Sequence, residues 1–187
     1  MDPRQARLLE LFQRAQAQVT DRVDAVEAEQ WDAVVRPGRD VADLVAHLVG
    51  EQLRVPPLLA GHPAGGPVPT DTEELLAGDP LGSWEAAADA ALTAFAQPGA
   101  VDATVQLAEG PAPATDHLTV LTTHLTVHAW DLARATGGDP VLDADLVAAA
   151  LEQVGAGRAA GLVDPASPVP AGADPLVRFL AAFDRRA

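Results

Sequence analysis

The chain has 187 residues, with 27 Asp and Glu against 12 Lys and Arg, and a formal net charge of −15 at pH 7. Apolar residues make up 48% of it and charged residues 21%, a composition typical of a folded domain rather than a disordered chain. The acidic balance argues against nucleic acids and anionic membranes as partners, because basic surfaces bind both.

Cysteine is absent from the sequence. This excludes disulfides, thiolate metal sites, iron–sulfur clusters and a cysteine nucleophile, so any thiol chemistry must use a thiol that arrives as a ligand. The N-terminal residues lack an apolar signal core, and no run of 18 apolar residues follows. We therefore expect a cytoplasmic protein.

The first predicted element is a long amphipathic helix. Asp2 can cap it, Pro3 suits its first position, and Gln5 completes a capping box. Apolar residues then recur at steps of three and four, which predicts one buried face. These residues are Leu8, Leu11, Phe12, Ala15, Val19, Val23 and Val26.

A second helix is expected to begin after Asp40, beyond a chain break at Pro37-Gly38, and to end or kink at Pro56-Pro57. Its inward face carries Leu44, His47, Leu48, Glu51 and Val55. A Pro- and Gly-rich loop from Gly61 to about Thr72 follows. Its length is near that at which loops usually act as lids or binding elements, or are disordered.

The rest of the chain predicts further helices and no alternating strand pattern of any length. We expect a helix at about 80–95, a short extended piece at 104–107, a helix at about 116–136, another at 144–160 and a last one at 175–183. The fold class is therefore all-α: an up-and-down four-helix bundle with additional C-terminal helices. Residues 1–140 form the bundle, and 141–187 form a helical extension packed on the same domain.

Three of the five histidines are candidate ligands of a metal ion. His124 and His128 are four residues apart, which puts both imidazoles on one face of the fourth bundle helix. His47 lies on the inward face of the second. Together they would form an open three-coordinate site with room for water or substrate. The alternative is that His124 and His128 are core imidazoles that hydrogen-bond to each other, to Thr123 or to water.

Two carboxylates lie close in sequence to these histidines. Glu51 is one turn after His47 and could be a fourth ligand, an acceptor that orients a ligand, a general base, or an ion-pair partner of Arg54 or Arg134. Asp131, three residues after His128, could pair with Arg134 or contact a ligand histidine.

The other two histidines have weaker claims to a role. His117 is on the same helical face as His124 but roughly 10 Å away along the axis, too far to share an ion. It would line the mouth of a pocket or be a polar residue of the first turn. His62 lies in the Pro- and Gly-rich loop, where surface exposure is expected.

At these residues the sequence resembles a known family. Residues 40–52 (DVADLVAHLVGEQ) and 124–137 (HLTVHAWDLARATG) are similar to the two metal segments of the mycothiol-dependent maleylpyruvate isomerase N-terminal domain. The resemblance covers residues 1 to about 140 and places the chain in an actinobacterial branch of the DinB-like superfamily. Residues 174–185 also resemble the end of that shorter branch.

The resemblance implies a DinB-like bundle that binds a divalent metal, usually zinc and sometimes nickel or iron. By motif position, His47 matches the first ligand and His128 the last, while His124 stands where the isomerase has Glu. In the family's mechanism, the metal lowers the pKa of a cofactor thiol, and the thiolate adds to an activated double bond. Mycothiol is then a possible co-substrate.

The isomerase proper carries a larger C-terminal domain, whereas about 47 residues follow the matching region here. The resemblance therefore implies the general chemistry rather than maleylpyruvate as the substrate. The predicted function is a divalent-metal-binding, thiol-dependent transferase or isomerase, acting on a small-molecule thiol and an electrophilic substrate. The alternative is a non-catalytic bundle that binds a small ligand or metal, or that forms a homodimer.

Overall fold

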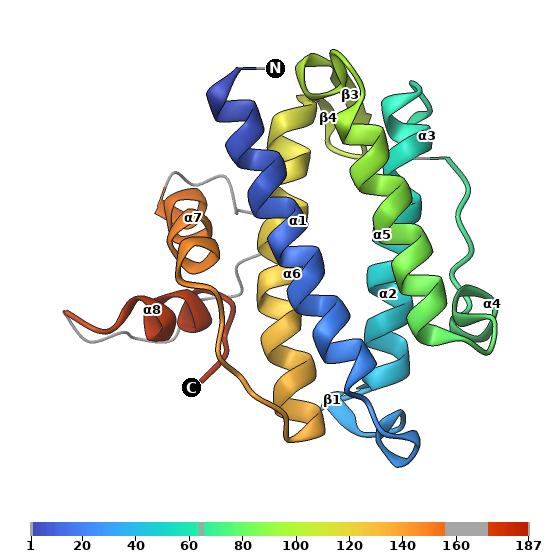
Figure 1. Cartoon of the computed structure of the whole chain (residues 1–187), viewed down its shortest axis with the longest axis vertical. Helices are drawn as coiled ribbons and strands as arrows, with labels where there is room; N and C mark the ends of the chain where they lie inside the picture. Colours follow the sequence, from blue (N-terminus) through green and yellow to red (C-terminus); the bar gives the residue numbers. More distant parts are fainter. Residues whose placement is uncertain (1, 64–65, 156–171, 187) are drawn as a thin grey trace.

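The computed structural model describes residues 2–63, 66–155 and 172–186, and four long helices dominate it (Figure 1). They confirm the expected all-α, DinB-like bundle. Their bounds are α1 Pro3–Asp24, α2 Val41–Leu53, α5 Pro80–Ala96 and α6 Ala114–Thr136.

Side-chain caps fix where three of these helices begin. Asp2 and Gln5 form the expected capping box of α1, and the Asp40 side chain accepts a hydrogen bond from the Asp43 amide at the start of α2. The Asp79 carboxylate caps α5 in the same way. α6 has no side-chain cap and begins at Ala114, two residues earlier than expected, directly after a strand.

The bundle helices are not arranged in sequence order. α1 packs against α5 and α6, and α2 packs against the same two helices. α2 and α5 run in the same direction in Figure 1, because the segment between them returns the chain to the opposite end of the bundle. The expected up-and-down order, in which successive helices alternate in direction, is therefore not kept between α2 and α5. That segment contains two short helices, α3 (Val55–Leu59) and α4 (Thr72–Leu76).

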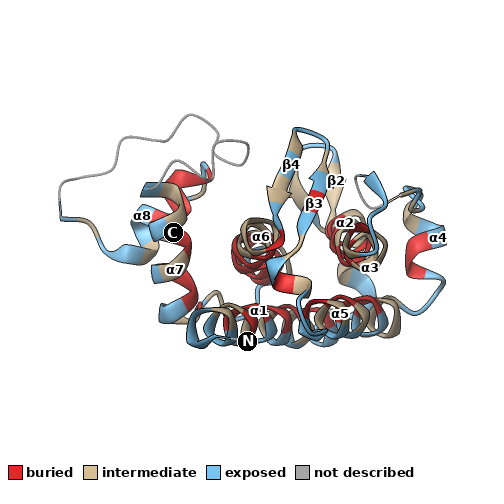
Figure 2. Ribbon diagram, turned by 90° about the horizontal axis from the view of Figure 1, so that it is seen from above, coloured by how far each residue is buried: buried red, intermediate tan, exposed pale blue. Residues whose placement is uncertain are grey.

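The core lies between the four helices, where Figure 2 shows the buried residues on their facing sides. Phe12 of α1 meets Phe95 of α5 edge-on, with ring centroids 5.6 Å apart. Trp84 is fully buried, and its indole N–H donates to the Thr20 hydroxyl at 2.9 Å. Aromatic burial of this size contributes heavily to the stability of a small bundle.

Two short antiparallel hairpins connect the helices. The first joins β1 (Val34–Arg36) to β2 (Arg39–Asp40), and the second joins β3 (Thr104–Leu107) to β4 (Gly110–Pro113). β3 is the expected extended piece. The other three strands were not predicted, because two to four residues are too few to show an alternating pattern. The described connections also contain the 3₁₀ turns Ala28–Gln30 and Ala100–Asp102.

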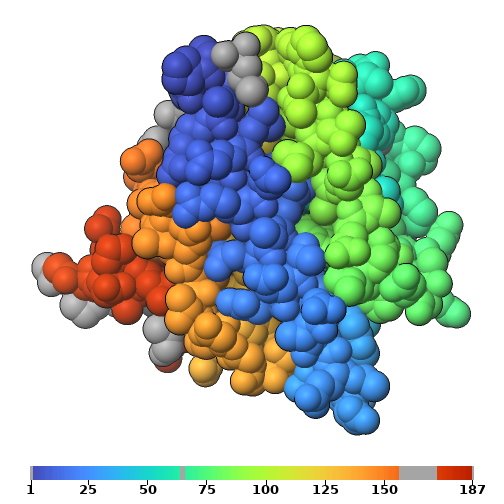
Figure 3. Space-filling view, in the orientation of Figure 1, coloured from blue at the N-terminus to red at the C-terminus, as the bar shows by residue number. Residues whose placement is uncertain are grey.

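The C-terminal part adds α7 (Ala144–Gly155) and α8 (Pro175–Ala182), which pack on each other beside α6 (Figure 3). The expected continuation of α7 to residue 160 falls outside the described residues. Arg14 of α1 pairs with Asp143 and Asp145 at the start of α7. Within the described ranges, no helix is both long and apolar enough to cross a membrane.

Candidate functional site

Three imidazoles from two helices lie close together in the bundle. The His128 ring centroid is 5.9 Å from that of His47 on α2 and 6.1 Å from that of His124 on α6. Nitrogens that share a zinc ion at its usual bond length would bring ring centroids to about 5 Å from one another. The rings are therefore about 1 Å wider apart than a common ion requires, and no described group of three potential ligands is already close enough to hold one.

Glu51 determines which nitrogen of His124 is protonated. The His124 Nδ1 lies 2.8 Å from Glu51 Oε1, and an ionised carboxylate can only accept a hydrogen bond. Nδ1 must therefore carry the proton, which leaves the Nε2 lone pair of the neutral ring available. The His47 Nε2 lies 3.7 Å from the same oxygen, too far for a hydrogen bond.

Only one of the two oxygens of the ionised Glu51 carboxylate has a hydrogen-bond partner among the described residues. Burial raises its pKa, but the hydrogen bond from His124 and the positive charges that the three imidazoles carry when protonated outweigh burial and lower the pKa to about 2. Its Oε2 is buried and has no hydrogen-bond partner. None of the described ion pairs joins Glu51 to Arg54 or Arg134, so Glu51 matches the expected acceptor that orients a histidine.

His128 is oriented by a second carboxylate. Its Nδ1 donates to Asp131 Oδ2 at 3.0 Å, again leaving Nε2 available. Asp131 is held in turn by Arg185, whose Nε and Nη2 donate to its two oxygens at 3.0 and 2.7 Å. The two side chains are only 5% and 9% exposed. Asp131 therefore contacts a candidate ligand, as one alternative predicted, and pairs with Arg185 rather than Arg134, which lies over the Trp130 ring.

Arg185 was not among the residues predicted to surround the site. It lies 54 residues after Asp131, beyond the last helix, and no spacing rule connects the two positions. The resemblance of residues 174–185 to the end of a related branch was the only available signal. The tertiary structure thus adds a residue of the C-terminal extension to the surroundings of His128.

His117 lies outside this cluster. Its ring packs near Phe95, with centroids 6.5 Å apart, and its Nε2 is buried without a hydrogen-bond partner. Burial lowers the pKa of the ring, as does the charge of His124, while Glu51 opposes them. His62 is exposed in the loop, as expected.

Replacing His117 with leucine is expected to raise the free energy of unfolding by about 1 kcal/mol at pH 7.5, because an unpaired buried polar atom is removed. The folded-state pKa of His117 is below that of the unfolded chain, so its contribution to stability declines as pH falls below about 6.5. Urea unfolding at pH 7.5 and at pH 5 should show that the free energy of unfolding changes less with pH in the variant than in the wild-type chain. Destabilisation at pH 7.5 with an unchanged pH dependence would contradict this.

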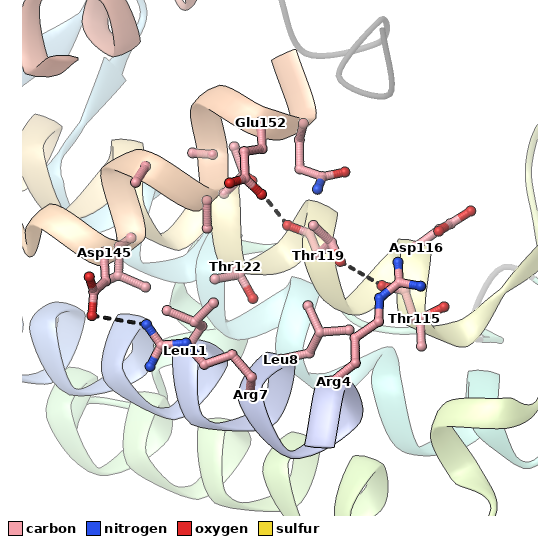
Figure 4. Close-up of a pocket in the computed structure, with 16 residues that line it drawn as sticks. Arg4, Arg7, Leu8, Leu11, Thr115, Asp116, Thr119, Thr122, Asp145 and Glu152 are labelled. Atoms are coloured by element: carbon pink, nitrogen blue, oxygen red, sulfur yellow. Dashed lines mark hydrogen bonds and ion pairs between the residues drawn. The ribbon is translucent and has the colours of Figure 1, made fainter. Parts of the chain in front are cut away.

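Two pockets lie near α6 and α2. The larger, about 360 Å³, lies between α1, α6 and α7 (Figure 4), and its lining contains none of the histidines. Thr115, Thr119 and Thr122 of α6 line it with Arg4 and Arg7 of α1. The smaller, about 290 Å³, has His47 in its wall and therefore adjoins the histidine cluster.

A family model for the mycothiol maleylpyruvate isomerase N-terminal domain matches residues 12–133, which contain all three histidines of the cluster. The chain belongs to this family. The recognised resemblance is thereby confirmed for two thirds of the chain.

Related proteins occur in an actinobacterium. Two uncharacterised proteins of Mycobacterium tuberculosis, from strains CDC 1551 and H37Rv, are each 36% identical to the chain over 121 residues. The match covers 64% of this chain and 59% of each relative, so the chain spans about three fifths of the curated relatives it matches.

Solved structures show the same fold. A crystal structure of a mycothiol-dependent maleylpyruvate isomerase superposes with a TM-score of 0.62 at 15% identity, covering 78% of this chain and 67% of that chain. A histidine-to-alanine mutant of that isomerase superposes with a TM-score of 0.60 at 14% identity over the same shares. At this identity the likeness establishes the helical architecture.

Proposed function

We propose that the protein binds a divalent metal, most simply zinc, through the Nε2 atoms of His47, His124 and His128, and that it catalyses a mycothiol-type thiol-dependent isomerisation or transfer. The observation that carries this proposal is the pair of hydrogen bonds from His124 Nδ1 to Glu51 and from His128 Nδ1 to Asp131. Histidines that bind metals almost always donate their other ring N–H to such an acceptor, which fixes the tautomer and the ring orientation.

The residues present fit a metal-bound thiol. A divalent metal, when bound, would lower the pKa of a coordinated thiol. Glu51 Oε2 is a buried acceptor without a partner beside the cluster, so it is available to accept a hydrogen bond from a bound thiol or water. The chain has no cysteine, so the sulfur must come from a small molecule. Family membership and the mycothiol-dependent isomerase fold favour mycothiol as that molecule.

The proposal is tested by zinc titration of the full chain together with a turnover assay. We expect about one zinc per chain, and turnover of a thiol with an electrophilic alkene that chelation abolishes and zinc restores. His62→Ala is the matched control, because it removes an exposed histidine outside the cluster. Less than about 0.2 zinc per chain would contradict the metal site. Zinc binding without any thiol turnover would instead support a non-catalytic binding module.

Zinc affinity is expected to be nearly constant above pH 7 and to fall steeply below about pH 6, because protons compete with the metal for the imidazole nitrogens. Burial is the largest of the effects on the pKa of His47 and lowers it, so the ring stays neutral to a lower pH than a free histidine. Competition with a chromophoric chelator at several pH values, corrected for the chelator's own titration, measures the effect. An affinity that is flat from pH 5 to 8 would rule out coordination by three histidines.

A further inference from the structure

The pocket beside His47 contains two arginines that form no ion pair with any described residue. It lies where the β1–β2 turn, α2 and the segment entering α4 meet, and its volume is about 290 Å³. Arg39 from the hairpin and Arg54 from the end of α2 both line it, with His47 between them in sequence. The His47 side chain is 35% exposed, so the ring belongs to the histidine cluster and to the pocket at once.

The two arginines line the pocket from opposite ends of α2. The Nη1 atom of Arg54 lies 3.6 Å from the position a Cβ would occupy on Gly50, so the side chain folds back along the helix toward His47. At the other end, Arg39 lies in β2, directly before α2, and lines the same pocket. Gly50 is part of the lining and leaves this space open.

The charged side chains that line this pocket are mostly positive. Within the described part of the chain, neither Arg39 nor Arg54 forms an ion pair or a side-chain hydrogen bond, so both are free to bind a ligand. One carboxylate, that of Asp43, lines the pocket, and its Oδ1 accepts a hydrogen bond from the Thr72 hydroxyl. Two arginines against one aspartate make the pocket positive in a chain whose net charge is −15.

We propose that this pocket binds an anionic group, a carboxylate or a phosphate, of a small ligand whose remainder reaches the histidine cluster past His47. Half-buried arginines that pair with none of the described residues suit such groups, because charge-assisted hydrogen bonds to guanidinium are strong and directional. The anion binding itself requires no metal. Its role in orienting a substrate rests on the proposed function.

The test is anion binding by the full chain after chelation, with circular dichroism to confirm that the helical fold is kept. Succinate and inorganic phosphate are titrated separately by calorimetry, and the stronger of the two identifies the group. We expect Arg39→Gln and Arg54→Gln each to weaken binding about tenfold or more. Arg36→Gln is the matched control, because it removes the same charge from the same hairpin outside the pocket lining.

Two outcomes would overturn the inference: neither anion binding to the wild-type chain with a dissociation constant below about 10 mM, or an equal loss in Arg36→Gln, which would indicate general electrostatic attraction. Zinc titration of the same variants separates this result from the proposed function. Zinc binding without anion binding defeats only the anion pocket. Anion binding by a chain that takes up no zinc defeats only the metal site.

Discussion

Replacing Arg185 with alanine is expected to lower the free energy of unfolding by about 3 kcal/mol, since removing one partner of a buried ion pair leaves the other charge uncompensated. Arg185 makes two hydrogen bonds to Asp131, and both side chains are almost fully buried. Without Arg185, the hydrogen bond from His128 is the one that the Asp131 side chain keeps among the described residues. Urea unfolding of the metal-free chain at pH 7.5 measures the loss.

The same substitution is expected to weaken zinc binding by about 10- to 100-fold, because Asp131 orients the His128 ring and Arg185 holds Asp131. Arg185→Lys should recover part of both effects, since a lysine supplies the charge but not the two parallel hydrogen bonds. Arg178→Ala is the matched control on α8, where the side chain is exposed. Equal losses in the Arg178 and Arg185 variants would show that the pair with Asp131 has no special role.

Replacing His128 with alanine is expected to reduce zinc affinity at least about a hundredfold, because it removes one of three proposed ligands from an already open site. His128 is the central ring of the cluster, within about 6 Å of both His47 and His124 by ring centroid. Competition with a chelator of known zinc affinity gives the ratio between variant and wild type.

His117→Ala is the informative control for this experiment, because His117 is also a partly buried histidine of α6 but lies outside the cluster. It should leave zinc affinity within about threefold of wild type, since it supplies no proposed ligand. If both variants bind zinc as tightly as the wild-type chain, the histidine cluster is not the metal site. The hydrogen bonds to Glu51 and Asp131 would then serve only to satisfy buried imidazoles, as the alternative interpretation of the sequence holds.

The helices could be predicted because their signals are local. Asp2 and Asp40 cap the helices that follow them, and the apolar spacing along α1 and α6 marks their buried faces. Proline and glycine residues predicted where the connections between helices lie. The kink expected at Pro56-Pro57 corresponds to the start of α3. The hairpins were largely missed, since their pairing joins strands of two to four residues.

The amino-acid sequence alone therefore determined the helical class, the absence of a protein thiol, and the candidates His47, His124 and His128, because helical periodicity and family motifs are properties of nearby residues. The tertiary structure decided which groups surround those candidates. It placed Glu51 against His124 and brought Arg185 to Asp131, residues that are 73 and 54 positions apart in the chain. Such contacts depend on how helices pack across tens of residues of intervening chain, and no local spacing encodes them.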